Sequence, residues 1–235
     1  MMHSGTTPIG RKSIPAWQDR FRDPSLTALL VIQICLMFVV APLVAQGLPM
    51  AREVGEALLL VAALIVVLLS RSRAAIVIFL LGIAAVAAGF LFLAELSGVS
   101  ATLLTRGGGI LAISALAWVV VHAVYAPGRI TPQRIQGAFV LYLVIAELFT
   151  RAYCLVWELS PAAFANLPAP TGGPSDTTTM LYFSLITLTT IGYGDIVPVS
   201  AFARSLTTLE AVTGQLYLVT TVARLVTLEL ENRRR

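Results

Sequence analysis

The sequence predicts an all-α membrane protein with six transmembrane helices, and its composition and charge pattern lead to this prediction. Of 235 residues, 57% are hydrophobic and 12% are charged, whereas a soluble domain carries about 25% charged residues. The mean hydropathy of +0.87 favours lipid over water as the solvent. The basic residues, all arginine except Lys12, stand mostly at the ends of apolar runs. The net charge of +4 is therefore typical of membrane anchoring, and no nucleic-acid partner is predicted.

Six apolar runs are each close to the 20 or so residues that a helix needs to cross a bilayer. They cover residues 25–46, 54–70, 74–96, 108–126, 136–158 and 201–228. A seventh run, 177–190, is too short to span. It lies between the fifth and sixth runs and predicts a re-entrant helix, which enters the membrane and leaves on the same side.

The arginine and lysine residues predict the orientation of these helices, because cytoplasmic loops carry most of them. With the N-terminus inside, the outer loops hold only Arg52 and Arg106. The inner segments then hold Arg11, Lys12, Arg20, Arg22, Arg71, Arg73, Arg129, Arg134, Arg233, Arg234 and Arg235. We therefore expect a multi-pass protein of the cell membrane with both termini cytoplasmic. The Ala- and Arg-rich, Lys-poor composition is compatible with a bacterial inner membrane.

Breaks between the runs predict the domain organisation. The segment 126–132, which contains Pro127, Gly128 and Pro132, separates a four-helix region from the last two helices. Gly107-Gly108-Gly109 is expected to end the loop between the third and fourth helices. The predicted parts are an N-terminal cytoplasmic tail over 1–24, a four-helix region over 25–126, a final region over 136–230, and a C-terminal cytoplasmic tail over 231–235.

The segment between the last two spans begins with a predicted short helix. Asp176 or Ser175 can cap a helix that starts at about Thr177. Such a helix would run inward and stop near Thr189, with its C-terminal carbonyls toward the middle of the membrane. The partial negative charge of that helix end favours a cation.

Two glycines, Gly192 and Gly194, follow this helix with one residue between them. Glycine tolerates backbone angles that other residues resist, and alternating such angles turns successive carbonyls to the same side. Non-helical backbone at membrane depth is tolerated where it is buried in protein or lines a watery cavity. The segment therefore predicts a narrow path lined with backbone oxygens.

The residues Thr190-Ile191-Gly192-Tyr193-Gly194-Asp195 resemble the selectivity filter of potassium channels of the pore-loop superfamily, with Ile191 where valine is commoner. The preceding Tyr182-Phe183-Ser184 and Thr187-Leu188-Thr189 resemble the pore helix of that family. The resemblance implies a homotetramer in which four filter strands surround one axis, and it makes 136–230 a pore domain. It also implies that K⁺ loses its hydration shell to the Thr190 hydroxyl and to backbone oxygens, those of Thr190, Ile191, Gly192 and Tyr193.

The resemblance also implies roles for the residues around the filter. Gly194 would permit the outer turn. Tyr193 would point away from the ion and pack against the pore helix, with Tyr182 and Phe183 as candidate neighbours. Asp195 would lie at the outer mouth, attract cations and hold the filter through hydrogen bonds.

The sequence departs from the family at one position behind the filter. Some members carry a pore-helix glutamate that pairs with the aspartate of the outer mouth, and the matching residue here is Ile186. Asp195 must therefore find another partner or face water. This departure leaves the inactivation behaviour of the filter open.

The last span carries a glycine and an acid that need an explanation. Gly214 resembles the gating-hinge glycine of the family's inner helix, and the alternative is close packing against the pore helix. Glu210 either lies behind the filter or pairs with Arg204. On the fifth span, Glu147 and Arg151 are four residues apart. We interpret both acids as members of structural pairs.

The six-span layout resembles that of voltage-gated channels, but the fourth span lacks the residues that sense voltage. A voltage sensor needs several arginines or lysines along this helix, and 108–126 has none. The region 25–126 thus resembles a sensor domain that does not sense voltage. Voltage gating of the usual kind is not expected, and the sequence does not name another stimulus.

These observations predict a potassium-selective channel subunit, not an enzyme, with K⁺ as the permeant ion, membrane lipid as surroundings and no cofactor. A weakly selective cation channel is an alternative, although a carboxylate in place of Tyr193 would be expected there. A potassium transporter subunit would instead show repeated pore loops with a single glycine. A non-conducting membrane scaffold or enzyme is the remaining alternative.

Overall fold

The computed structural model describes most of the chain from residue 27 onward. Described are residues 27–48, 98–125 and 132–233, together with 50, 51, 54, 58, 61, 62, 65, 76, 77, 79–81, 83 and 84. The predicted tail 1–24 and most of the predicted spans 54–70 and 74–96 lie outside the described residues. The same holds for the last two residues of the predicted C-terminal tail.

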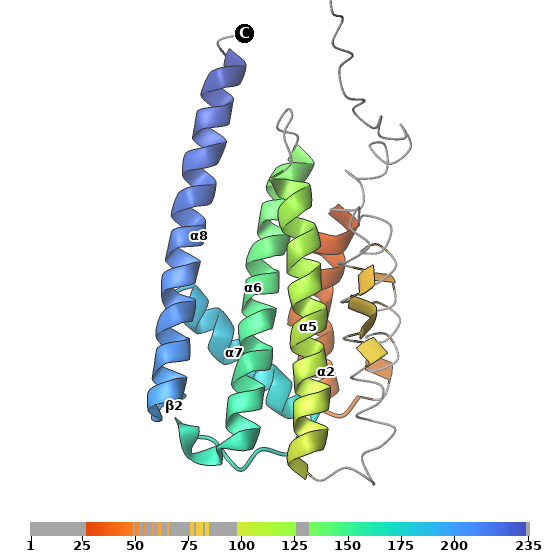
Figure 1. The fold of residues 1–235 in the computed structure, drawn as a ribbon, viewed down its shortest axis with the longest axis vertical. Helices are drawn as coiled ribbons and strands as arrows, with labels where there is room; N and C mark the ends of the chain where they lie inside the picture. The colour runs from red at the N-terminus through yellow and green to blue at the C-terminus, as the bar shows by residue number, and fades with distance from the viewer. Residues whose placement is uncertain are drawn as a thin grey trace, which may run out of the picture.

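Helices make up most of the described chain. In chain order the elements are η1 (Leu36–Val40), α2 (Ala41–Ala45), α5 (Gly98–Val124), α6 (Pro132–Leu159), η2 (Pro161–Ala163), β1 (Phe164–Ala165), α7 (Pro174–Leu188), β2 (Val197–Pro198) and α8 (Ala201–Arg233). The long helices α5, α6 and α8 run roughly along the length of the molecule, and the shorter α7 lies obliquely between α6 and α8 (Figure 1).

Three helices among the described residues are long and apolar enough to cross a membrane: Thr27–Ala45, Thr102–His122 and Ile135–Leu159. They agree with the predicted spans 25–46, 108–126 and 136–158. The first contains the π-helical turn η1 just before Pro42. Because proline has no N–H and its ring crowds the preceding turn, the wider π turn gives Pro42 room inside a continuous span.

The start of α5 corrects one prediction. Gly107-Gly108-Gly109 was expected in a loop, but all three lie inside α5, which begins at Gly98. A Cβ added at Gly109 would lie at ordinary contact distance, 3.5 Å from an Arg151 guanidinium nitrogen of α6, and one added at Gly107 would meet nothing within 4 Å. Three successive glycines favour a loop, but each costs a helix only about 1 kcal/mol relative to alanine, so a long helix can contain them.

The core of the described chain lies between α6 and its neighbours. Its first part joins α5, α6 and the first helix. Its second part lies between α6, α7 and the start of α8, and three rings meet there edge to face: Tyr153, Phe164 and Phe183. These contacts fix α7 against α6.

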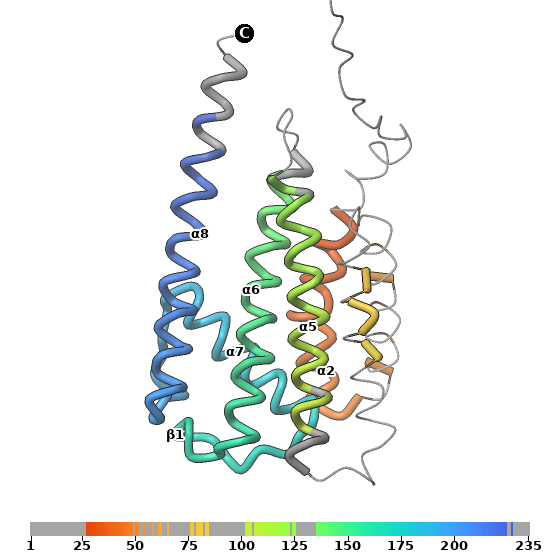
Figure 2. Tube along the Cα trace, viewed as in Figure 1, coloured from red at the N-terminus to blue at the C-terminus, as the bar shows by residue number. Residues whose placement is uncertain are grey.

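The segment between α6 and α8 leaves and returns to the same end of the molecule. The chain passes through η2 and β1, rises along α7 to about half the height of α6, and comes back to β2 (Figures 1 and 2). This is the path expected of the predicted re-entrant helix 177–190, and re-entry into a membrane stays a prediction. Helix α7 begins three residues earlier than expected, at Pro174.

The described chain is mostly helical, in agreement with the all-α prediction, and it contains one short antiparallel pairing. Phe164 pairs with Pro198 and Ala165 with Val197. The amide of Val199 also donates to the Ala163 carbonyl at 2.8 Å. Two-residue strands leave no periodic pattern in a sequence, so the prediction missed them.

Helix α8 covers the predicted sixth span 201–228 but is not among the three apolar helices. Its threonines lower its apolarity, and their hydroxyls donate to carbonyls four residues earlier, as Thr207 does to Ala203 and Thr213 to Leu209. Such internal hydrogen bonds satisfy hydroxyls without water. With 33 residues the helix is about 50 Å long, and its role as a span stays a prediction.

Candidate functional site

The segment after α7 has an alternating backbone. Thr190, Gly192 and Gly194 have positive φ angles of 60°, 56° and 79°, whereas Ile191 and Tyr193 between them do not. A left-handed conformation costs a non-glycine residue about 1–2 kcal/mol, so Thr190 is strained. The sequence predicted unusual angles at the two glycines, and the structure extends the alternation to a threonine.

Hydrogen bonds from this segment to the end of α7 hold the strained backbone in place. The amide of Thr190 donates to the Thr187 carbonyl at 2.9 Å. The amides of Ile191 and Gly192 both donate to the Ile186 carbonyl, at 2.8 and 3.1 Å. Carbonyls that the helix end leaves without partners are thereby satisfied. Ile186, predicted as the departure from the family pattern, thus contributes its backbone.

Asp195 forms a hydrogen bond with a residue of α7. The Tyr182 hydroxyl donates to the Asp195 carboxylate at 2.8 Å, and this hydrogen bond raises the pKa of Tyr182 above its ordinary value. The Tyr182 ring also stacks on Tyr193, with centroids 6.5 Å apart and an interplanar angle of 8°. Tyr182 of α7 therefore contacts both Tyr193 and Asp195.

Phe183, the other candidate neighbour of Tyr193, packs elsewhere. Its ring packs 5.0 Å from Tyr153 and 5.6 Å from Phe164, measured between centroids, in the core behind α7. The expectation that Phe183 neighbours Tyr193 is therefore wrong. Successive helical residues point about 100° apart, so Tyr182 and Phe183 cannot both face the same side.

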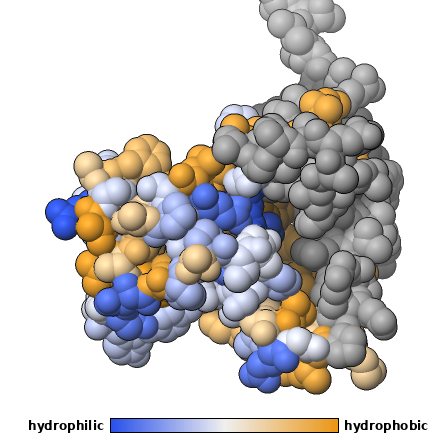
Figure 3. Space-filling model, turned by 90° about the horizontal axis from the view of Figure 1, so that it is seen from below, coloured by the Kyte–Doolittle hydropathy of each residue, from blue (hydrophilic) through white to orange (hydrophobic). Residues whose placement is uncertain are grey.

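Two side chains of the alternating segment 190–194 and one side of α8 are exposed in the single chain. Ile191 is 55% and Tyr193 70% exposed. Large exposed apolar residues continue along α8: Phe202, Leu209, Val212, Leu216, Val219 and Val222. An apolar surface of this extent requires a cover of protein or lipid. Seen from the end near β2, polar and apolar residues are interspersed over the described surface (Figure 3).

An acid on α8 lies behind α7 rather than on the surface. Glu210 is fully buried. It contacts the hydroxyls of Tyr153 on α6 and Ser184 on α7. The expected ion pair with Arg204 is not formed, because Arg204 lies outside this site and donates to the Pro198 carbonyl at 3.2 Å. Glu210 lies behind α7 instead, and its position relative to a filter stays a prediction.

One turn further along α8, Gly214 packs against the last residue of α7. A Cβ added to Gly214 would lie 2.5 Å from the Leu188 carbonyl oxygen and 2.9 Å from the Leu188 side chain. The Tyr142 hydroxyl of α6 donates to the same carbonyl at 3.2 Å. Gly214 therefore has a packing role, and its role as a gating hinge stays a prediction.

The next residue, Gln215, was missed by the sequence analysis. Its side-chain amide donates to the Thr190 hydroxyl at 3.4 Å. A single glutamine in a helix carries no recognisable motif. Its proximity to the implied innermost ion ligand depends on how α8 packs against α7.

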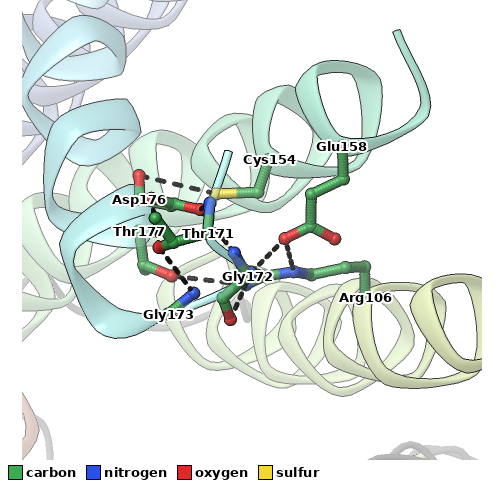
Figure 4. A network of polar contacts seen from close by, with 8 residues as sticks. All are labelled: Arg106, Cys154, Glu158, Thr171, Gly172, Gly173, Asp176 and Thr177. Atoms are coloured by element: carbon green, nitrogen blue, oxygen red, sulfur yellow. Dashed lines mark hydrogen bonds and ion pairs between the residues drawn. The ribbon is translucent and has the colours of Figure 1, made fainter. Parts of the chain in front are cut away.

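Arg106 links α5 to the loop before α7 and to α7 itself (Figure 4). It forms an ion pair with Glu158 at the end of α6. It also donates to the Thr177 hydroxyl and the Gly172 carbonyl, each at 3.3 Å. The sequence analysis placed Arg106 in an outer loop, and the structure places it in α5 beside the loop that precedes α7.

Asp176 stabilises the same loop, which corrects its predicted capping role. The helix begins at Pro174 with Gly173 as its N-cap. The carboxylate of Asp176 instead accepts from the amides of Thr171 and Gly172, at 2.6 and 2.7 Å. An acid in the third helical position commonly reaches back in this way.

The predicted pair of Glu147 and Arg151 is not an ion pair in the structure. Among the described residues, Glu147 accepts a hydrogen bond from Gln33 of the first helix at 3.1 Å. The Arg151 guanidinium lies against Gly109 of α5. The two side chains thus connect α6 to different helices, which their spacing on α6 could not reveal.

The ion pair of Arg106 and Glu158 is expected to stabilise the link between α5 and the loop before α7. Both side chains are about nine-tenths buried, with 11% and 10% exposed. Removing one partner of a buried pair costs roughly 3–5 kcal/mol, because the other charge stays unpaired. Arg106→Gln or Glu158→Gln should each lower the thermal unfolding temperature in detergent, and the double variant should lose less than the sum.

Arg224→Gln is the matched control for this prediction. Arg224 is exposed and its guanidinium lies 4.4 Å from the centre of the Tyr125 ring. An exposed contact of this kind contributes about 0.5–1 kcal/mol. Additive losses at Arg106 and Glu158, or losses no larger than in Arg224→Gln, would contradict the proposed coupling.

Comparison with known proteins supports an ion-channel reading of this region. Residues 139–230 match the family described as "Ion channel". A relative, the inward rectifier potassium channel Kirbac3.1 of Paramagnetospirillum magnetotacticum, is 37% identical over 78 residues. The match covers 33% of this chain and 23% of the relative, so the chain spans less than a quarter of that protein's length. No solved structure matches this chain.

The matched residues include α7, the alternating segment and most of α6 and α8. Together with the three apolar helices, they indicate a membrane protein. The two matches support an ion channel of the pore-loop type rather than an enzyme, and neither indicates a cofactor.

Proposed function

We propose that the chain is one subunit of a homotetrameric potassium-selective channel whose filter is Thr190–Gly194. The observation that carries the proposal is the alternation of positive φ at Thr190, Gly192 and Gly194, at the end of a short oblique helix. Alternation of this kind directs successive carbonyls to one side. Four such strands would replace the hydration shell of K⁺ with backbone oxygens.

In this proposal the K⁺ ligands are the backbone oxygens of Thr190, Ile191, Gly192 and Tyr193, with the Thr190 hydroxyl as the innermost ligand. Contacts outside the ion path hold their geometry: loop amides on the end of α7, and the stack of Tyr182 on Tyr193. Asp195, held by Tyr182, lies at the outer mouth and attracts cations. The exposure of Tyr193 and of the apolar side of α8 is consistent with partner subunits at this surface.

The proposed layout has six membrane helices, both termini in the cytoplasm and the segment 159–200 outside. The pore domain covers 136–230, and 25–126 forms the surrounding four-helix region. The source membrane is the bacterial inner membrane. Arg106, whose side chain lies near the loop before α7, is consistent with an outer position for the start of α5.

Voltage gating of the usual kind is not part of the proposal. Arg106 is the single arginine or lysine of α5, and its charge is paired with Glu158. Gating by movement of a charged helix needs several charges along that helix. A different stimulus must therefore open the channel.

Ion flux from liposomes tests the proposal. Purified protein should release K⁺ from vesicles, Ba²⁺ should block the release, and Na⁺ should pass far more slowly. Equal K⁺ and Na⁺ fluxes would favour a weakly selective cation channel. Tetramers that carry neither ion at any voltage, pH or membrane tension would favour a non-conducting scaffold.

A further inference from the structure

The buried acid on α8 joins three helices through hydroxyl contacts. The Tyr153 hydroxyl of α6 donates to one Glu210 carboxyl oxygen at 2.6 Å. The other oxygen contacts the Ser184 hydroxyl of α7 at 2.5 Å. Ser184 in turn contacts the Ala146 carbonyl of α6 at 2.8 Å. None of the three side chains needs water to complete this network.

The number of protons available in the network indicates whether the Glu210 carboxyl group is protonated. A serine hydroxyl has one proton to donate, and a backbone carbonyl only accepts. If Ser184 gives its proton to Ala146, the contact with Glu210 requires a proton on the carboxyl group. If Ser184 donated to a carboxylate instead, its oxygen would face the Ala146 carbonyl at 2.8 Å with no proton between them. Only a neutral carboxyl satisfies both contacts.

The surroundings of Glu210 agree with this count. The groups that face it are the phenol of Tyr153, the hydroxyl of Ser184 and, at longer range, the phenol of Tyr142. Within the described part of the chain no basic side chain forms an ion pair with it. An isolated buried carboxylate costs several kcal/mol, whereas a hydrogen-bonded neutral acid avoids that cost.

We propose that Glu210 is a neutral carboxylic acid that fastens α7 between α6 and α8 and thereby positions the filter. The proposal rests on the channel function proposed above. It assigns Glu210 as a positioning residue, since it touches neither the filter segment nor its ion path.

The position of the network explains how it reaches the filter. Glu210 and Gly214 are one turn apart on α8, and they contact Ser184 and Leu188, one turn apart on α7. The filter segment begins two residues after Leu188. Ser184 and Leu188 therefore fix the last turn of α7 from behind, at two successive levels.

The proposal has a consequence for pH dependence. Loss of the Glu210 proton leaves Ser184 with one proton for two acceptors, so either the Glu210 or the Ala146 contact is lost, and it leaves a buried negative charge between three helices. Protonated Glu210 therefore holds α7 in place, and alkaline pH should weaken the contact between α8 and α7. Channel activity should fall as the external and internal pH rise together above neutral.

The test combines infrared spectroscopy with ion flux on the full chain in liposomes. Glu210→Gln keeps a donor for Ser184 and an acceptor for Tyr153 but cannot lose a proton. The parent should show a carbonyl band of a protonated carboxyl that is absent from Glu210→Gln. K⁺ flux of the parent should fall by about tenfold for each pH unit beyond the onset of deprotonation, while flux through Glu210→Gln stays level.

Two results would overturn the proposal: the absence of that band from the parent, or the same alkaline fall of flux in Glu210→Gln. If Glu210→Gln does not accumulate, Ser184→Ala replaces it. This variant removes the acceptor of the Glu210 proton, so the band should shift in frequency, and an unshifted band would refute the contact. A parent that shows the band but carries no K⁺ would contradict the channel function alone.

Discussion

Gly192→Ala is expected to abolish the preference for K⁺ over Na⁺ while the protein still inserts and assembles. Gly192 has a φ of +56°, and a side chain there costs about 1–2 kcal/mol in each subunit. A Cβ at this position would meet nothing within 4 Å in the single chain, so the effect is conformational. The filter can relieve it by leaving the alternating backbone, which turns carbonyls away from the ion. Reversal potentials under K⁺ and Na⁺ gradients measure the loss.

Gly172→Ala provides the matched control. Gly172 has a φ of +74° and open space around its Cβ position, so alanine costs about as much there. It lies in the loop before α7, outside the filter segment. Gly172→Ala should lower stability to a similar extent and leave selectivity intact. If Gly192→Ala selects K⁺ as the parent does, the filter assignment is wrong.

Gly214→Ala is expected to disrupt the pore more severely than its small volume change implies. In an open helix alanine is about 1 kcal/mol more favourable than glycine. Here its Cβ would lie 2.5 Å from the Leu188 carbonyl oxygen, and a backbone atom cannot move aside without moving α7. Overpacking of this kind costs about 1–3 kcal/mol, so the clash outweighs the propensity. Thermal unfolding and K⁺ flux should both fall.

A second variant separates packing from hinge bending. Thr213 is half-buried, and Thr213→Gly restores a flexible residue next to Gly214→Ala without restoring space at Leu188. If Gly214 acts by packing, the double variant stays defective. Recovery of flux in the double variant would instead favour the hinge that the sequence predicts. Thr213→Gly alone shows whether an added glycine is tolerated.

The features that could be predicted from the sequence are those set by residues close together in the chain. Apolar runs located the first, fourth and fifth spans, and the short run 177–190 located α7 to within a few residues. The spaced glycines predicted unusual backbone angles at 192 and 194, and both have positive φ. Each of these features depends on residues close together in the chain, whose preferences persist in the folded state.

Features that depend on packing between helices were not predictable in the same way. Thr190 adopts a positive φ against its own preference because amide contacts with α7 over-determine the segment. Glycines 107–109 lie inside a helix, although three successive glycines favour a loop. Glu210 bonds to residues 57 and 26 positions away, a choice that neighbouring charges such as Arg204 did not indicate.

The pairing of β1 with β2 has a consequence for how the outer surface can vary. It pins together the two ends of the segment that holds the loop before α7, α7 itself and the filter. Doubling the length of a flexible loop costs only about 0.6 kcal/mol of closure entropy. New sequence added near residues 166–170 would extend outward from a fixed base. The loop surface at this end of the molecule is thus free to vary in sequence while α7 and residues 190–194 keep their positions.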